Sequence, residues 1–178
     1  MNKQFFDENE KRDFEKLIEF NERTGLFTEL TQLKEKYHAD ASGYTINKFG
    51  ERRNFNIELK NRNLNLLDDG RISGATQKGT FIDDTVYIEA HKAADLLFDL
   101  MDGLEPLYIN FLQDGKILIY NLSKLTKRPM KTDNMNIKSV GYGRFEMAKR
   151  EGLYIKDAAI YDSNYNLIKR AGEEWITK

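Results

Sequence analysis

Cysteine is absent from this chain of 178 residues, and its two histidines, His38 and His91, lie far apart in the sequence. A disulfide framework and a thiolate zinc site are therefore excluded. No segment is long and apolar enough to span a bilayer. The first eight residues also lack the apolar core of a signal peptide. We therefore expect a soluble, cytoplasmic protein with no membrane partner.

Neither sign of charge is in excess, because 28 basic residues face 29 acidic ones and the formal net charge is −1. The total charge therefore gives no indication of a nucleic-acid or membrane partner. Gly70, Gly74 and Gly79 lack the spacing of a phosphate-binding loop, which excludes a P-loop. The length suits a single domain over 1–178. Within it we expect a core over about 5–122 and a basic C-terminal extension over about 123–178.

Basic residues nevertheless gather between Lys116 and Arg150, where nine bases face two acids. A segment of about +7 in a neutral protein could attract a polyanion. The alternative is a solvated basic surface. Tyr120, Tyr142 and Phe145 lie in this segment and could stack on bases, although such aromatics are more often part of a core or its rim.

The hydrophobic pattern alternates between helical and extended periods along the chain. Apolar residues three and four apart predict a helix over about 5–23, a shorter one over about 29–36, and a third from a cap at Asp83 or Asp84 to about Met101. The polar segment 61–79 is expected to be a long loop with a turn at residues 68–70.

Segments in which apolar and polar residues alternate predict two pairs of strands. Strands over 37–46 and 53–60 would form a hairpin, and strands over 107–112 and 117–122 are joined by Asp114-Gly115, a strong hairpin signal. The tail is mixed, with a strand or short helix over 140–148 and a last element over 154–160. We expect an α+β or mixed α/β domain with a central mixed β-sheet flanked by helices.

The triplet Glu58-Leu59-Lys60 carries the strongest chemical signal. Side chains two apart on a strand share a face, so Glu58 and Lys60 should point the same way, and Ile57 and Leu59 the opposite way. A carboxylate beside an ammonium on one rigid strand can hold a divalent metal and activate a water. Taken alone, the same pattern is common as a plain surface ion pair.

Asp40 adds a third group to this pair. If the hairpin turn is centred on Phe49, the residue numbers of each strand pair sum to 98, which places Asp40 opposite Glu58. Two opposed carboxylates destabilise a sheet unless a cation lies between them. We therefore predict that Asp40 and Glu58 bind a hard divalent ion with Lys60 alongside, in a register that a slip of one residue would break.

Asp40, Glu58 and Lys60 resemble the signature of the PD-(D/E)xK nuclease superfamily. That signature is an Asp followed by a turn and then by a hydrophobic strand that ends in Glu-x-Lys. The resemblance covers about residues 5–122 and includes a helix before the Asp strand and another after the motif. The family's proline before the acid is replaced here by Ala39. The resemblance implies a restriction-endonuclease-like core.

It also implies a magnesium-dependent nuclease, an endodeoxyribonuclease, that hydrolyses phosphodiester bonds in DNA. The metal would be bound by Asp40, Glu58 and the backbone carbonyl of Leu59, with Mn²⁺ able to substitute, and Lys60 would be the catalytic lysine. Family members often act as homodimers.

In this family, residues from neighbouring helices often complete the site, and the resemblance does not decide which helix residues do so here. Glu15, Glu19 and Glu22 are the candidate acids of the first helix, while His91 and Lys92 could reach the site from the helix after the motif. The main alternative function is a non-catalytic nuclease-fold module that binds DNA or a protein partner. A third is an accessory protein without a nucleic-acid role.

Overall fold

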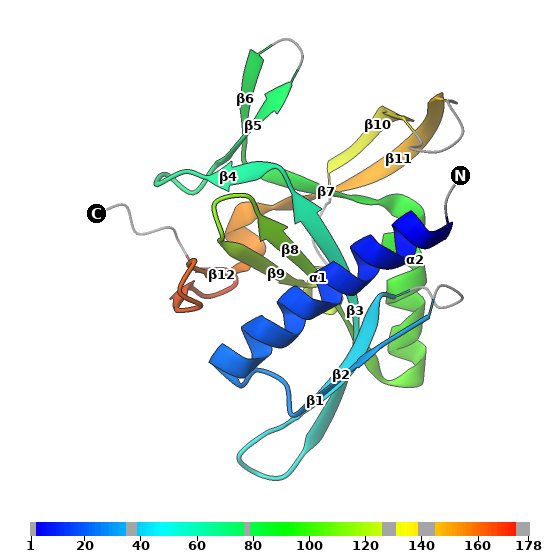
Figure 1. The fold of residues 1–178 in the computed structure, drawn as a ribbon, viewed down its shortest axis with the longest axis vertical. Helices are drawn as coiled ribbons and strands as arrows, with labels where there is room; N and C mark the ends of the chain where they lie inside the picture. The colour runs from blue at the N-terminus through cyan, green and yellow to red at the C-terminus, as the bar shows by residue number, and fades with distance from the viewer. Residues whose placement is uncertain (1–2, 35–38, 77–78, 126–130, 139–144, 174–178) are drawn as a thin grey trace.

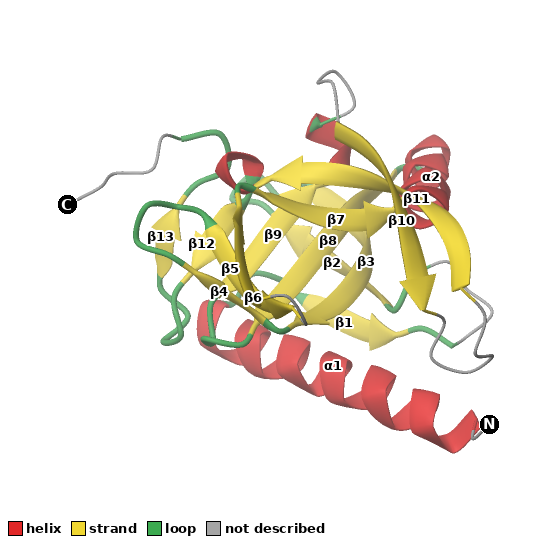
Figure 2. Ribbon diagram, turned by 90° about the horizontal axis from the view of Figure 1, so that it is seen from above, coloured by secondary structure: helices red, strands yellow, loops and turns green. Residues whose placement is uncertain are grey.

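The computed structural model describes residues 3–34, 39–76, 79–125, 131–138 and 145–173, with the backbone alone for 3–7, 131–138 and 145–149. A central mixed sheet has helix α1 (Lys3–Thr24) on one face. On its other face lie helix α2 (Ala90–Phe98) and a smaller sheet (Figures 1 and 2). This confirms the expected mixed α/β architecture with a central mixed sheet and flanking helices.

Helix α1 follows the predicted helix closely. Leu17 and Phe20 are fully buried against the sheet, as their spacing on one helical face requires. Gly25 ends the helix at φ +61°, and its N–H donates to the carbonyl of Asn21 at 2.8 Å. The Asn21 side chain in turn bonds the backbone of Phe27, which fixes the path from α1 into the sheet.

The central sheet joins strands from both ends of the described chain. Its spatial order is β1 (Glu29–Gln32), β2 (Ala41–Ile46), β3 (Arg52–Arg62), β8 (Leu104–Leu112), β9 (Ile117–Asn121), β12 (Ala159–Tyr161) and β13 (Leu167–Lys169). Strands β3 and β8 are parallel, while their other neighbours pair antiparallel. Helix α2 lies on the crossover that a parallel pair requires. The predicted hairpin at Asp114-Gly115 is confirmed by the β8–β9 pairing.

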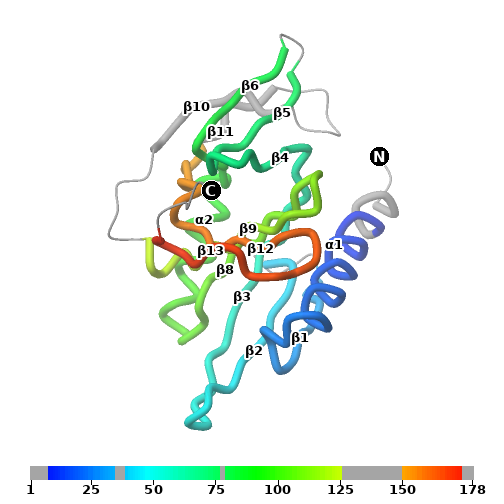
Figure 3. The backbone as a smooth tube through the Cα atoms, turned by 90° about the vertical axis from the view of Figure 1, so that its left-hand side faces the viewer, coloured from blue at the N-terminus to red at the C-terminus, as the bar shows by residue number. Residues whose placement is uncertain are grey.

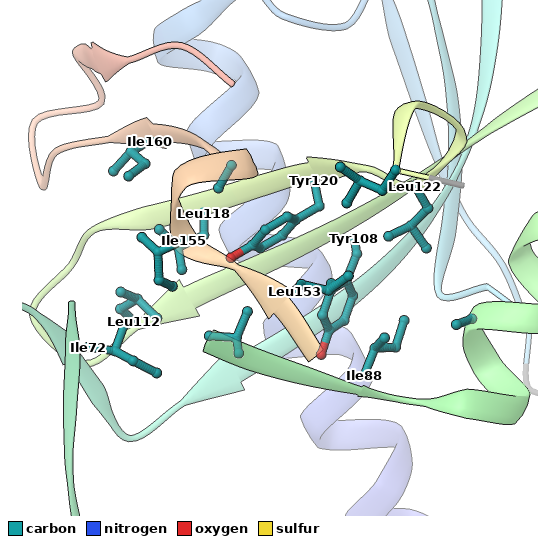
Figure 4. Close-up of a cluster of buried hydrophobic side chains, with 14 of the residues drawn as sticks. Ile72, Ile88, Tyr108, Leu112, Leu118, Tyr120, Leu122, Leu153, Ile155 and Ile160 are labelled. Atoms are coloured by element: carbon teal, nitrogen blue, oxygen red, sulfur yellow. The ribbon is translucent and has the colours of Figure 1, made fainter. Parts of the chain in front are cut away.

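Alternation along these strands divides the core in two. Ile57, Leu59 and Ile109 pack on the α1 side. Tyr108 and Tyr120 project from β8 and β9 to the other side, into the cluster drawn in Figure 4. Because neighbouring residues on a strand point to opposite faces, Glu58 must lie on the side of Tyr108.

The smaller sheet covers that second face. It has the order β10 (Lys131–Lys138), β11 (Phe145–Tyr154) and β7 (Thr85–Glu89). Val86 and Ile88 of β7 and Leu153 of β11 are buried in the cluster with Tyr108. In Figure 2 this sheet and α1 lie on opposite sides of the central sheet. Residues beyond 123 thus contribute strands to both sheets.

Two helix predictions are wrong in part. Residues 29–32 form strand β1, paired with β2, because a segment of about eight residues makes only a marginal helix and an open sheet edge lies beside it. Residues 85–89 form strand β7 and α2 begins only at Ala90, without the side-chain cap expected from Asp83 or Asp84. The apolar Val86 and Ile88 alternate, and their pairing with β11 outweighs the helical spacing.

The loop predicted over 61–79 is also wrong. This segment contains β4 (Leu64–Leu66) and β5 (Ile72–Thr76), which pair with each other, and β5 also pairs with β6 (Gly79–Asp83). The turn at residues 68–70 is confirmed, with Gly70 at φ +82°. The resulting arm projects from the body of the molecule, as Figures 1 and 3 show. Residues 37–38 and 140–144 of the other predicted elements lie outside the described part of the chain.

Candidate active site

Asp40 lies beside Glu58 at the end of the β2–β3 ladder. Ala41 pairs with Ile57 and Ile46 with Arg52, so each pair sums to 98, as the turn position predicted. The Asp40 N–H donates to the carbonyl of Ile57 at 3.0 Å, and its carboxylate Oδ2 accepts from the N–H of Leu59 at 2.7 Å. These two bonds hold Asp40 against the residues on either side of Glu58.

Glu58 is a buried carboxylate, with 2% of its surface exposed. Its pKa is raised to about 7, because burial and, next, the negative charge of Asp40 raise the pKa more than the positive charges of Lys92 and Lys60 lower it. The side chain therefore changes its charge near neutral pH. Such a shift, caused by desolvation together with a specific charged neighbour, is typical of functional sites.

Lys92 supplies the cation closest to Glu58. Its ammonium forms a salt bridge with Glu58 Oε1 from the first turns of α2. Burial acts to lower the pKa of Lys92, but the attraction of Glu58, Asp40 and Glu89 outweighs it and raises the pKa. Of the two helix residues predicted to reach the site, Lys92 does so. His91 is exposed, and its Nε2 lies 3.6 Å from Glu89 Oε2.

Oxygen atoms at the end of the ladder suit a hard cation. Asp40 Oδ2 accepts a hydrogen bond from the Leu59 N–H, and Glu58 Oε1 accepts one from Lys92. The other oxygen of each carboxylate accepts no hydrogen bond from the described part of the chain. In a β-strand, the N–H and the C=O of a given residue point toward the same side of the strand. The Leu59 carbonyl therefore points to the edge where β2 has ended and Asp40 lies. Two carboxylates and one carbonyl fit the oxygen preference of Mg²⁺.

A cavity of about 220 Å³ adjoins these groups. Glu58, Lys60 and Arg62, which alternate along one face of β3, line it together with Lys92. Arg62 donates through Nε to Asn110 Oδ1 at 3.1 Å, and through Nη2 to the Tyr87 carbonyl and the Tyr108 hydroxyl. Arg62 is thus held rigidly beside Glu58 and Lys60.

Asp13 of α1 interacts electrostatically with Asp40 and Lys60. Burial raises its pKa, Arg12 and Lys16 lower it, Asp40 raises it and Lys60 lowers it. The Asn61 amide of β3 donates to Asp13 and accepts from Lys16, which fastens the helix to the strand.

The three helix acids named from the sequence lie elsewhere. Glu15 is exposed and lies 3.9 Å from Lys11, and Glu19 accepts from the Tyr165 hydroxyl at 2.8 Å. Glu22 is exposed and makes no hydrogen bond or ion pair with the described residues.

The basic segment from Lys116 to Arg150 is divided. Lys116 donates to Asp114 and to the Leu66 carbonyl, both at 2.9 Å, so it holds the β8–β9 turn to the arm. Arg150 lines the cavity. Tyr120 is fully buried and is a core residue. Tyr142 and the side chain of Phe145 lie outside the described residues.

Sequence reasoning missed two residues near the site. Arg62 continues the alternation of Glu58 and Lys60, and Asp13 precedes Leu17 by one helical turn on the sheet-facing side, so both had a detectable signal. Arg150 was expected only as part of the basic segment, and its place at the cavity follows from the pairing of β11 with β7, at a sequence distance that no local pattern encodes.

Comparisons of the chain with protein-family models, curated proteins and solved structures find no match. Within the described residues, no three His, Cys, Asp or Glu side chains are grouped as a metal site. Asp40, Glu58 and Leu59 together offer two carboxylates and one backbone carbonyl to a cation. In the same part of the chain, no helix has the length and apolarity needed to cross a membrane.

Proposed function

We propose that this protein is a metal-dependent nuclease that hydrolyses phosphodiester bonds in DNA, with a restriction-endonuclease-like core. The observation that carries the proposal is the Asp40 carboxylate, which accepts from the Leu59 N–H while it raises the pKa of neighbouring Glu58. Two carboxylates in this position would be stabilised by a divalent cation. The order α1, β2, β3, α2 and parallel β8 supports the fold assignment.

Asp40, Glu58 and the Leu59 carbonyl would hold Mg²⁺, for which Mn²⁺ could substitute. The ion would supply a Lewis acid for the phosphate and lower the pKa of a bound water. Because Glu58 must be ionised to act as a ligand and its pKa is about 7, metal affinity should rise with pH through neutrality.

Lys60 would orient the attacking water or neutralise charge on the phosphoryl oxygens. In hydrolysis the water oxygen bonds to phosphorus, the bond to the leaving oxygen breaks, and the leaving oxygen takes up a proton. One product then ends in a phosphate monoester and the other in a hydroxyl. Basic residues between Lys116 and Arg150 would contact the DNA backbone. A cytoplasmic location and a homodimer belong to the same proposal.

The test is incubation of supercoiled and linear DNA with Mg²⁺ or Mn²⁺. Lys60→Met, Asp40→Asn and Glu58→Gln should each reduce cleavage by about 100-fold or more, since each removes a group that stabilises the transition state. Lys48→Met, in the exposed β2–β3 turn, is the matched control and should cleave normally. No cleavage by clean wild-type protein, or equal cleavage by Lys60→Met, would contradict the proposal.

One observation favours a non-catalytic module that binds DNA or a protein partner. The Lys92–Glu58 salt bridge gives the buried carboxylate a cation within the protein itself. Calorimetry with Mg²⁺ and Mn²⁺ separates the two functions. Metal binding that is lost in Asp40→Asn and Glu58→Gln favours the enzyme. Absence of metal binding, with DNA affinity that falls steeply with salt, favours the module.

A further inference from the structure

The cavity beside Glu58 has a surplus of positive charge. It lies among β3, β7, β8, β11 and the start of α2, and its lining contains four bases and two acids. The bases are Lys60, Arg62, Lys92 and Arg150, and the acids are Glu58 and Glu89. They come from both sheets and a helix, so the tertiary structure alone brings them together. An anion of high charge density would complement this lining.

Arg62 is prepared to bind such an anion. Its Nε and Nη2 atoms are fixed by Asn110, Tyr108 and the Tyr87 carbonyl. Its Nη1 atom has no hydrogen-bond partner in the parts of the chain that the structure describes. A guanidinium held in one orientation loses little side-chain entropy when it binds a phosphate.

The size and cover of the cavity restrict what can enter. At about 220 Å³ it is smaller than the pockets that hold drug-sized ligands, which span roughly 300–1,000 Å³. Strand β7 and helix α2 cover this face of the central sheet, and Glu58 is 2% exposed. A phosphate with part of one nucleotide fits such a space, with Tyr87, Ile88 and Tyr108 as its less polar wall. An intact duplex does not fit.

We propose that this cavity binds the terminal phosphate of a nucleic-acid strand, so that the substrate class is phosphorylated strand ends. The catalytic meaning of this inference rests on the proposed nuclease function, but the binding itself needs no metal. A terminal monoester carries a second negative charge above a pKa of about 6, whereas an internal diester carries one. The cationic surplus therefore favours an end over the interior of a strand.

The experiment is fluorescence anisotropy in EDTA at pH 7.5, with single-stranded oligonucleotides that carry a 5′-phosphate, a 3′-phosphate or neither. One phosphorylated form should bind about tenfold tighter than the unphosphorylated strand, as expected for added charge-assisted hydrogen bonds. Arg62→Gln and Arg150→Gln should each abolish this preference. Arg53→Gln is the matched control, because Arg53 lies at the opposite end of β3, where it bonds Glu105.

Arg62 also holds the backbone of β7, so thermal unfolding of Arg62→Gln shows whether its fold is intact, and Arg150→Gln supplies an independent variant. Equal affinity for all three strands would overturn the inference. Inorganic phosphate that binds as tightly as the phosphorylated strand would overturn it too, since the site would then recognise free phosphate. Lys60-dependent cleavage without an end preference defeats this inference alone. An end preference without cleavage in Mg²⁺ defeats the nuclease function alone.

Discussion

The ammonium of Lys92 on α2 forms a salt bridge with the buried carboxylate of Glu58 on β3. This contact joins the helix to the central sheet, across 34 positions of sequence. It offsets part of the cost of burying Glu58 next to Asp40, because an unpaired charge there would have to be neutralised by protonation. Lys92 is therefore the internal counter-ion of the candidate metal centre.

Lys92→Met should raise the pKa of Glu58 above about 7, because the attraction that lowers it is removed while burial and Asp40 still act. The measurement is ¹³C NMR of side-chain carboxyl groups in EDTA, with Glu58→Gln to assign the resonance. Lys48→Met, on the exposed turn, should leave the titration unchanged. An unaltered Glu58 titration in Lys92→Met would show that the salt bridge does not persist in solution.

Glu58 should make the protein less stable as pH rises. Its folded pKa of about 7 exceeds the ordinary value of 4.5, so its contribution to stability is fully present below pH 4.5 and is lost as pH rises through 7. The loss amounts to roughly 3 kcal/mol at most. Urea unfolding in EDTA at pH 4.5 and 8 should show a larger decrease for wild type than for Glu58→Gln. Parallel pH profiles would contradict the assigned pKa.

If Asp40 binds the metal as proposed, Asp13→Asn should weaken Mg²⁺ binding by about tenfold, as loss of a group in the outer shell of a metal site commonly does. The reason is that its carboxylate lies close enough to Asp40 for their charges to interact. Glu15→Gln is the control on the same helix, since Glu15 is exposed and pairs with Lys11. Calorimetry measures the Mg²⁺ affinity of both variants, and a wild-type affinity for Asp13→Asn would show that Asp13 does not contribute to metal binding.

Tyr108 and Tyr120 are neighbouring buried rings with centroids 6.4 Å apart, but their hydroxyls differ (Figure 4). The Tyr108 hydroxyl accepts from Arg62 and donates to the Tyr87 carbonyl, so Tyr108→Phe should cost about 1–2 kcal/mol of stability. The Tyr120 hydroxyl has no hydrogen-bond partner among the described residues, so Tyr120→Phe should be neutral or stabilising within about 0.5 kcal/mol. Chemical denaturation of both variants checks the contrast, and equal losses would contradict it.

Gly43→Ala should destabilise the edge of the sheet that leads to Asp40. A Cβ at Gly43 would lie 2.8 Å from the Glu29 carbonyl oxygen and 2.8 Å from Leu30 Cδ2. The backbone oxygen cannot move without disturbing the β1–β2 pairing, so we expect a loss of about 1–3 kcal/mol. Ser42→Ala on the same strand is the control. Thermal unfolding gives the comparison, and a wild-type melting temperature for Gly43→Ala would show that β1 can move aside.

Much of the candidate site follows from local patterns. The alternation of Glu58, Lys60 and Arg62 and the position of the β2–β3 turn fix which side chains share a face, and the observed register agrees. Helix α1 and the β8–β9 hairpin follow from their apolar spacing and from Asp114-Gly115. These features depend on residues close in sequence, so periodicity and turn chemistry suffice to predict them.

The incorrect predictions have a different origin. Residues 85–89 could be read as the first turn of a helix because Val86 also fits the apolar spacing of α2. Their strand conformation depends on pairing with β11, more than fifty positions away, which local propensity does not contain. The same long-range pairing carries Arg150 to the cavity.

The sequence alone established that the chain has no cysteine chemistry, and it predicted that Glu58 and Lys60 share a strand face and that Asp40 lies next to Glu58. The reason is that side-chain direction along a strand is a local property. Only the tertiary structure decided that Glu58 is buried with a pKa near 7, that Lys92 is its partner and that Arg62 and Arg150 line one cavity with Lys60. Burial and charge proximity depend on how β7, β11 and α2 pack over the central sheet, and these contacts join residues far apart in the chain.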